Sequence, residues 1–218
     1  MILQDRTEGG KLLAEHLAGY RNQRDVLILA LPRGGVPVAW EVTQHLHAPL
    51  DIFLVRKLGA PGHGELAIGA VATGGVRVLN NWLISMLGVT DAELEAITDR
   101  ELAELERRQR LYRGDRPLPE IGGRTILLID DGLATGATMR AAVLAIQQKE
   151  PARLVVGVPI ASSESCDAFR DEVDQVICAV TPEPFHAVGL WYRNFEQVSD
   201  EEVQDLLARS RGDPFTQV

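Results

Sequence analysis

The most informative segment of the sequence is Arg124-Thr-Ile-Leu-Leu-Ile-Asp-Asp-Gly-Leu-Ala-Thr-Gly-Ala-Thr138. Its apolar run, Ile126–Ile129, predicts a strand that is covered on both faces. Two carboxylates and a turn of small residues follow, and the apolar spacing over residues 139–146 predicts a helix. A strand, a loop and a helix in this order are typical of an open α/β sheet, in which ligands bind at the carboxyl ends of the strands.

The loop between this strand and this helix has the composition of a phosphate-binding site. Residues 134–138 carry no bulky side chain, and their backbone N–H groups begin a helix, where free donors and the helix dipole favour an anion. A hydrogen bond to a charged group contributes roughly 1.5–3 kcal/mol, so several together can anchor one phosphate. Asp130 and Asp131 would repel a phosphate, but they can accept hydrogen bonds from sugar hydroxyls or bind a hydrated divalent cation. The combination predicts a site for a ribose 5-phosphate.

Ile126–Thr138 resembles the phosphoribosyl-diphosphate (PRPP) signature of the type I phosphoribosyltransferases: a hydrophobic strand, two acidic residues and Ala-Thr-Gly-small-Thr. The resemblance implies that Asp130 and Asp131 bind the ribose hydroxyls, act in catalysis and hold Mg²⁺ through water. It further implies a cradle for the 5-phosphate that consists of Ala134, Thr135, Gly136, Ala137 and Thr138. The alternative is an ordinary strand, turn and helix with a capping threonine. A P-loop is excluded because no Gly-Lys-Ser/Thr follows the turn.

A second strand–loop–helix unit lies earlier in the chain. Val26–Leu31 is fully apolar and predicts a buried strand, and a helix is expected over residues 36–46. The loop between them contains an arginine followed by two glycines, which allow the backbone to approach a ligand closely. The resemblance implies that this loop binds the diphosphate through Arg33, Gly34 and Gly35, whereas a plain surface turn is the alternative.

A third strand is predicted over Asp51–Val55, and a basic pair, Arg56 and Lys57, follows it directly. The resemblance implies that both residues bind the diphosphate, and the alternative is that they are solvated charges at a strand end. The glycine-rich residues 58–66 predict a mobile loop. A hairpin is expected from residue 67 to residue 79.

The next segment predicts a long helix that begins at the capping box Thr90-Asp-Ala-Glu93 and runs to about Tyr112. By resemblance, residues 58–116 would form a lid over the reaction centre, and residues 182–218 would form a small hood with the carboxyl-terminal tail. A lid would keep water from the ribosyl cation-like transition state.

The sequence contains a weaker signal for the residues that would bind the acceptor. Phe185 or Trp191 could stack on a nucleobase, or could simply pack the tail onto the core. Hypoxanthine-guanine enzymes of this family carry an aspartate where this chain has an alanine in the cradle, so their base activation does not transfer. Lys57, Glu65 and His63 are the remaining candidates for catalysis by a loop residue.

Charge and cysteine content limit the classes of function. The chain has 218 residues and a formal net charge of −9, which argues against nucleic acid or an anionic membrane as the main partner. Cys166 and Cys178 have no CxxC spacing and are predicted to be reduced, buried thiols. The sequence lacks a signal-peptide pattern and an apolar run of about 20 residues. We therefore expect a cytoplasmic protein.

Together these patterns predict one α/β domain over residues 1–218, with a mostly parallel sheet flanked by helices, a lid and a small hood. The resemblance implies a Mg²⁺-dependent phosphoribosyltransferase that moves the 5-phosphoribosyl group of PRPP to a nitrogenous base or similar small-molecule acceptor and releases diphosphate. Because type I relatives commonly form homodimers, the resemblance implies a homodimer. The alternative is a PRPP-binding regulator without turnover. A metal-dependent hydrolase that uses the acidic pair is a weaker possibility, because it leaves the cradle without a purpose.

Overall fold

The structure is a computed structural model that describes residues 1–212, without the side chains of residues 64, 65 and 212. Its main sheet is parallel throughout and has the strand order β2-β1-β6-β7-β8. The strands are β1 (Val26–Ala30), β2 (Leu50–Ile52), β6 (Thr125–Ile129), β7 (Arg153–Ile160) and β8 (Gln175–Val180). The central strand β6 is buried along its whole length, as its apolar run predicts.

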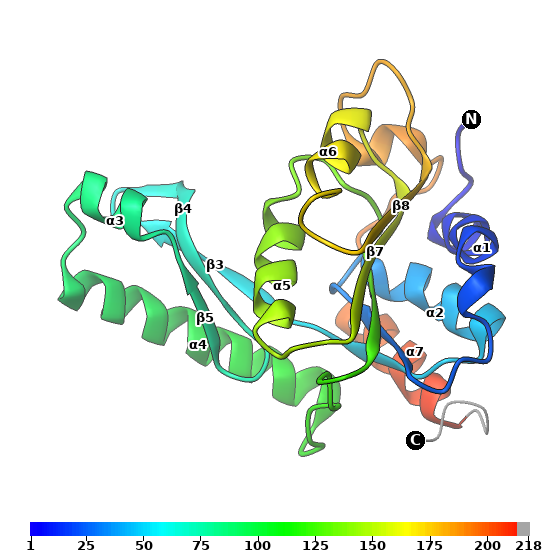
Figure 1. The fold of residues 1–218 in the computed structure, drawn as a ribbon, viewed down its shortest axis with the longest axis horizontal. Coiled ribbons are helices and arrows are strands. Elements are labelled where there is room, and N and C mark those ends of the chain that lie inside the picture. The colour runs from blue at the N-terminus through cyan, green and yellow to red at the C-terminus, as the bar shows by residue number, and fades with distance from the viewer. Residues whose placement is uncertain (213–218) are drawn as a thin grey trace.

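Helices cover both faces of this sheet (Figure 1). Alternate residues of each strand point to opposite faces, so Leu127 and Ile129 pack in one apolar cluster and Ile126 and Leu128 in another. The first face is covered by α1 (Arg6–His16), α2 (Gly35–Leu46) and α7 (Asp200–Gly212), and the second by α5 (Ala137–Gln147) and α6 (Ser163–Ala168). The chain also has two short turns of 3-10 helix, η1 (Ala18–Tyr20) and η2 (Val188–Trp191). The predicted α/β fold with a mostly parallel sheet is confirmed.

An arm projects from this body (Figure 1). It consists of a three-stranded antiparallel sheet and two helices. Its elements are β3 (Val55–Ala60), β4 (His63–Ala72), β5 (Val76–Leu79), α3 (Asn81–Leu87) and α4 (Asp91–Arg113). The predicted capping box is present at the start of α4, because the Glu93 N–H donates to Thr90 Oγ1 at 3.3 Å and the Thr90 N–H donates to Glu93 Oε2 at 2.9 Å.

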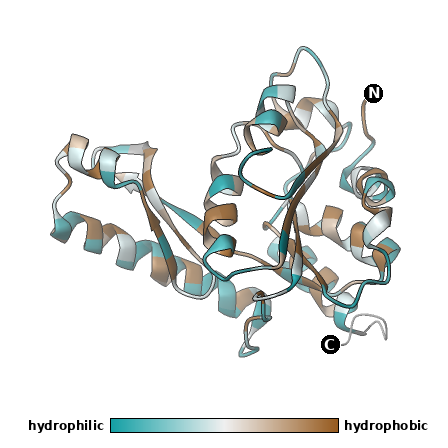
Figure 2. Cartoon of the chain, in the orientation of Figure 1, coloured by the Kyte–Doolittle hydropathy of each residue, from teal (hydrophilic) through white to brown (hydrophobic). Residues whose placement is uncertain are grey.

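Hydrophobic and hydrophilic residues lie on different faces of the arm's long helix α4 (Figure 2). The face of α4 toward the strands buries Ile97 and Leu105, while most of its charged residues are exposed, as the narrow apolar stripe predicts. The lid predicted for residues 58–116 and the hood predicted for residues 182–218 stay predictions, and residues 213–218 of the hood lie outside the described residues.

Two sequence predictions in the arm were wrong. The strand expected over residues 51–55 is divided: Phe53 donates its N–H to Ala30 of the main sheet at 2.9 Å, whereas Leu54 donates to Thr73 Oγ1 at 2.8 Å. The chain therefore changes sheets between these two residues. The mobile loop expected over residues 58–66 is instead the hairpin of β3 and β4, which turns at Pro61-Gly62, where Gly62 has a φ of 72°.

The two cysteines were also predicted wrongly. Cys166 of α6 and Cys178 of β8 form a disulfide, with Cα atoms 6.5 Å apart. Their spacing in the sequence does not reveal this pairing, because only the packing of α6 beside β8 brings the two sulfurs together. The two cysteines therefore no longer support the prediction that the protein is located in a reducing compartment.

Two segments, residues 1–5 at the amino terminus and residues 191–195 ahead of α7, lie side by side at one end of the body, and they are called the two terminal segments. The Leu3 N–H donates to the Trp191 carbonyl at 2.8 Å, and the Arg193 N–H donates to the Leu3 carbonyl at 2.9 Å. Leu3 is fully buried beside Tyr192 and Ile160. This pairing brings the start of α1 to the carboxyl end of the main sheet.

Candidate functional site

The acidic pair follows β6 at the carboxyl end of the central strand, where the sequence predicts a ligand site. The Asp131 N–H donates to Asp130 Oδ1 at 2.8 Å. Burial raises the pKa of Asp130 well above its usual range, and the neighbouring Asp131 carboxylate raises it further. Burial also raises the pKa of Asp131, but Arg6 opposes that rise. The pair is a desolvated acceptor site.

Asp131 is held at both its side chain and its backbone. Arg6 Nε lies 2.8 Å from Asp131 Oδ2, and the two side chains are only 12% and 16% exposed. The Tyr192 hydroxyl donates to the Asp131 carbonyl at 2.6 Å. Burial, followed by the charge of Asp131, raises the pKa of this phenol, so Tyr192 stays a hydrogen-bond donor.

The glycine loop of residues 33–35 packs directly against the acidic pair. A Cβ at Gly34 would collide with the Asp131 carboxylate, and one at Gly35 would lie 2.7 Å from the Ile129 carbonyl. The Pro32–Arg33 peptide bond in this loop is cis. Only glycine allows so close an approach, so the loop predicted to bind diphosphate and the pair predicted to bind ribose meet in space.

The predicted cradle is an open loop at the start of α5. Ala134, Thr135, Ala137 and Thr138 are exposed, whereas Gly136 is buried and caps the helix in the left-handed region, with a φ of 71°. A Cβ at this glycine would lie 2.7 Å from the Phe169 ring. No described side chain caps the first N–H groups of α5, so they are free to bind an anion.

Hydrogen bonds with β7 and α6 hold the base of the cradle in place. The Leu133 N–H donates to the Ile160 carbonyl of β7 at 2.9 Å, and the Ser165 hydroxyl of α6 donates to the Ala134 carbonyl. A loop that is fixed at its base and open at its tip can present backbone donors without a large ordering cost.

The predicted diphosphate-binding cations are not gathered at one place. Arg33 Nη1 lies 3.6 Å from Asp200 of α7, which also accepts a hydrogen bond from Tyr112 of α4. Burial, together with the hydrogen bond to Asp200, raises the pKa of Tyr112 to about 12. The backbone of Arg33 therefore lies beside the acidic pair, because the next residue, Gly34, contacts Asp131. The Arg33 guanidinium points toward Asp200 of α7.

Arg56 and Lys57 lie within β3 of the arm. Arg56 donates to Glu101 of α4, with Nη2 at 2.7 Å from Oε2, and Lys57 is exposed. Both residues line a hollow of about 490 Å³ that also includes Arg100. Glu101 and Tyr112 are about 16 Å apart along α4, so the structure does not bring this basic pair together with Arg33. The cause is the change of sheets between Phe53 and Leu54.

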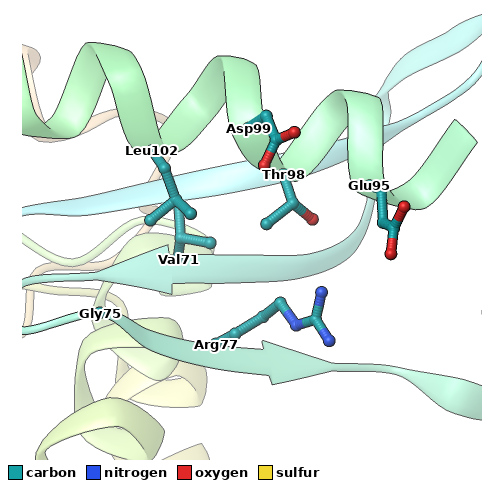
Figure 3. Close-up of a pocket in the computed structure, with 7 residues that line it drawn as sticks. All are labelled: Val71, Gly75, Arg77, Glu95, Thr98, Asp99 and Leu102. Carbon is teal, nitrogen blue, oxygen red and sulfur yellow. The ribbon is translucent and has the colours of Figure 1, made fainter. Parts of the chain in front are cut away.

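A second hollow in the arm, of about 450 Å³, lies between α4 and the strands β4 and β5 (Figure 3). Arg77 of β5 extends into it, toward the side of α4 that carries Glu95 and Thr98. None of the predicted site residues lines this hollow.

The predicted stacking residues pack against the body. Phe185 and Trp191 are partly buried around Leu3 and Tyr192, which agrees with the packing alternative. The side chain of Glu65 lies outside the part of the chain that the structure describes, and His63 is exposed at the start of β4.

Three residues around Asp131 were not predicted from the sequence: Arg6 and Tyr192, which contact it, and Phe195, which contacts both of them. The Arg6 guanidinium carbon lies 4.0 Å from the centre of the Phe195 ring, and Phe195 stacks on Tyr192 with ring centres 5.0 Å apart. Arg6 lies in the first helix and the two aromatics lie near the carboxyl terminus, and no local pattern connects these segments. Only the pairing of the two terminal segments reveals them.

The described residues contain no group of three or more His, Cys, Asp or Glu side chains that could hold a metal by themselves. Two carboxylates can still bind Mg²⁺ together with oxygens of a phosphorylated substrate, which is the usual arrangement for this ion. Among the described helices, none is both long and apolar enough to cross a membrane.

Comparison with known proteins identifies the family. Residues 5–188 match the phosphoribosyl transferase domain. Two Mycobacterium tuberculosis proteins with provisional names as phosphoribosyl transferases are 42% identical over 212 residues, which is 97% of this chain and 48% of theirs. The crystal structure of TT1426 from Thermus thermophilus is 41% identical, with a TM-score of 0.84 over 96% of this chain and 99% of that one. The chain belongs to the phosphoribosyl transferase family, and it spans about half the length of the curated relatives.

Proposed function

We propose that this protein transfers the 5-phosphoribosyl group of PRPP to a nitrogenous acceptor and releases diphosphate, with Mg²⁺ as cofactor. One observation carries the proposal: the acidic pair, the glycine loop and the open cradle meet at the carboxyl end of β6. Carboxylates can accept hydrogen bonds from the ribose hydroxyls, and the backbone N–H groups of the cradle can donate to the 5-phosphate. The two groups of residues therefore match the two ends of a ribose 5-phosphate. Family membership supports transfer from PRPP in general.

Each segment has a distinct task in this reaction. The carboxylates accept hydrogen bonds from the ribose hydroxyls, and the N–H groups around Thr135 and Thr138 donate to the 5-phosphate. The backbone at Gly34 and Gly35 faces the diphosphate. The bond between the ribose C1 and the diphosphate oxygen breaks, a bond from C1 to the acceptor nitrogen forms, and the acceptor loses a proton. Mg²⁺ would be held by one or two carboxylates and by substrate oxygens, and it would neutralise charge on the leaving diphosphate.

A regulator that binds PRPP without turnover is the second candidate. It is favoured by the ion pairs that Arg33 and Arg56 form with Asp200 and Glu101, because neither guanidinium is presented freely for catalysis. The homodimer and the cytoplasmic location predicted from the sequence stay predictions. A Cys166–Cys178 disulfide that persisted in the cell would count against a cytoplasmic location.

The test combines binding and turnover. PRPP is titrated calorimetrically with and without Mg²⁺, and diphosphate release is then measured with a panel of purine and pyrimidine bases. Binding with base-dependent release supports the transferase, and binding without release supports the regulator. Unchanged PRPP affinity in the double variant Asp130→Asn, Asp131→Asn would contradict both.

Two glycines provide a matched pair of variants for this test. Gly34→Ala should lower PRPP affinity at least tenfold, because its methyl group displaces the Asp131 carboxylate. Gly19→Ala is the control, since a Cβ there meets nothing within 4 Å. Equal affinities of the two variants would show that the contact between the glycine loop and Asp131 is not needed.

A further inference from the structure

We infer that Arg6 is a positioning residue of the ribose subsite, which fixes the Asp131 carboxylate so that one oxygen is presented to a sugar hydroxyl. The inference rests on the proposed function, because it assigns a task to Asp131 in binding ribose. Arg6 lies far from the PRPP signature in the sequence, in the first turn of α1. It reaches the acidic pair only through the tertiary structure.

Three contacts immobilise the Arg6 guanidinium. Its Nε lies 2.8 Å from Asp131 Oδ2, its Nη1 donates to the Glu196 carbonyl at 2.8 Å, and its central carbon lies 4.0 Å from the centre of the Phe195 ring. A guanidinium that makes two hydrogen bonds and lies against an aromatic ring differs from an exposed ion pair, whose partners separate readily. Removing such a partly buried partner leaves the carboxylate without its counter-charge.

The two oxygens of Asp131 have different surroundings. Oδ2 accepts from Arg6, and Gly34 packs against the same atom. Among the described residues, no side chain donates a hydrogen bond to Oδ1, and Arg6 is the one side-chain donor to this carboxylate. A carboxylate that is pinned at Oδ2 has a defined orientation, and its free acceptor is Oδ1. Arg6 therefore does not compete for the oxygen that a ligand would use.

The support for Arg6 continues into the carboxyl-terminal segment. Phe195, which stacks under Arg6, also stacks on Tyr192, and the Tyr192 hydroxyl holds the Asp131 backbone. The bonds between Leu3 and residues 191 and 193 fix this segment beside the start of α1. The two terminal segments therefore orient Asp131 from its side chain and from its backbone.

The experiment compares two probes, ribose 5-phosphate and inorganic phosphate, by calorimetric titration of the full chain. In the wild type, ribose 5-phosphate should bind more tightly, and the ratio of the two affinities measures the contribution of the sugar. Arg6→Ala should lower ribose 5-phosphate affinity about tenfold, which corresponds to the loss of about 1.4 kcal/mol. Inorganic phosphate affinity should not change, because the cradle is untouched.

Two further variants keep the test decisive. Arg6→Lys retains the charge but not the planar stack, and should lose part of the sugar preference while remaining folded. Arg209→Ala is the matched control, because Arg209 also pairs with a carboxylate, Asp205, and lies over an aromatic ring, that of Trp40. It should keep the full sugar preference.

Several outcomes would overturn the inference. Equal loss of both probes in Arg6→Ala, with a lower Tm, would mean that Arg6 only supports the fold. An unchanged sugar preference in Arg6→Ala and Arg6→Lys would mean that Asp131 needs no positioning, and tighter ribose 5-phosphate binding would make Arg6 a competitor. Failure of the wild type to prefer ribose 5-phosphate would instead contradict the proposed function, and with it the role of Asp131.

Discussion

At the scale of single residues, the site is built from groups in costly environments. Asp130 is desolvated beside a second carboxylate, and Gly34 leaves no space for any side chain. Burying a carboxylate disfavours its charged form, and Asp130 has no cation of its own among the described ion pairs. Residues kept in such positions are typical of functional sites.

The raised pKa of Asp130 predicts how stability depends on pH. Because the folded-state pKa lies above the unfolded one, the folded protein binds more protons, and stability falls as the pH rises from about 4 through the folded pKa. Asp130→Asn removes that loss and keeps the acceptor oxygen for the Asp131 N–H. Without Mg²⁺, the variant should melt a few degrees above the wild type at pH 7. The difference should disappear near pH 4. Thermal melts at several pH values measure this, and a constant difference would refute it.

At the scale of elements, small helices and loops of the body hold the cradle. The short helix α6 donates a hydrogen bond from Ser165 to the cradle, and it is joined to β8 by the Cys166–Cys178 disulfide. Phe169, at the end of α6, fills the space above Gly136. The geometry of the predicted cradle therefore depends on an element that comes later in the sequence.

The disulfide should stabilise this part of the fold. Reduction should lower the free energy of unfolding by about 2–3 kcal/mol, as expected for a closed loop of this size. Urea denaturation with and without a reductant measures the effect. The double variant Cys166→Ser, Cys178→Ser is the control and should not respond to reductant. If the wild type is equally insensitive, the bond is either absent in solution or without influence on stability.

At the scale of the whole molecule, the arm and the body meet at Arg113. This last residue of α4 is almost completely buried, and its Nη2 donates to Asp51 at 2.9 Å and to the Ile52 carbonyl at 3.0 Å. Its Nε and Nη1 have no partner among the described residues. The arm is therefore attached to the edge strand β2 by a charge that is only partly satisfied.

Arg113→Ala should lower the free energy of unfolding by about 3 kcal/mol, because Asp51 loses its counter-charge in a partly buried position. Arg113→Met with Asp51→Asn should recover most of that loss, since no unpaired charge remains. Chemical denaturation of both variants tests the prediction. A double variant as unstable as Arg113→Ala would show that packing, rather than the ion pair, holds the arm.

The centre of the candidate site follows from the amino-acid sequence alone. The apolar run of β6, the acidic pair and the small residues after it are contiguous, so their strand, loop and helix follow from local periodicity and side-chain size. The glycine loop and the capping box of α4 were found for the same reason. Family membership over residues 5–188 agrees with that local signal.

The surroundings of this centre depend on how distant parts of the chain pack together. The contacts of Arg6 and Tyr192 with Asp131, the disulfide, and the placement of Arg56 and Lys57 in the arm all depend on which distant segments pack together. A strand that changes sheets between two adjacent residues leaves no periodic signal, and paired terminal segments share no local pattern. Local order is encoded in neighbouring residues, whereas the walls of this site are made by long-range burial and hydrogen bonding.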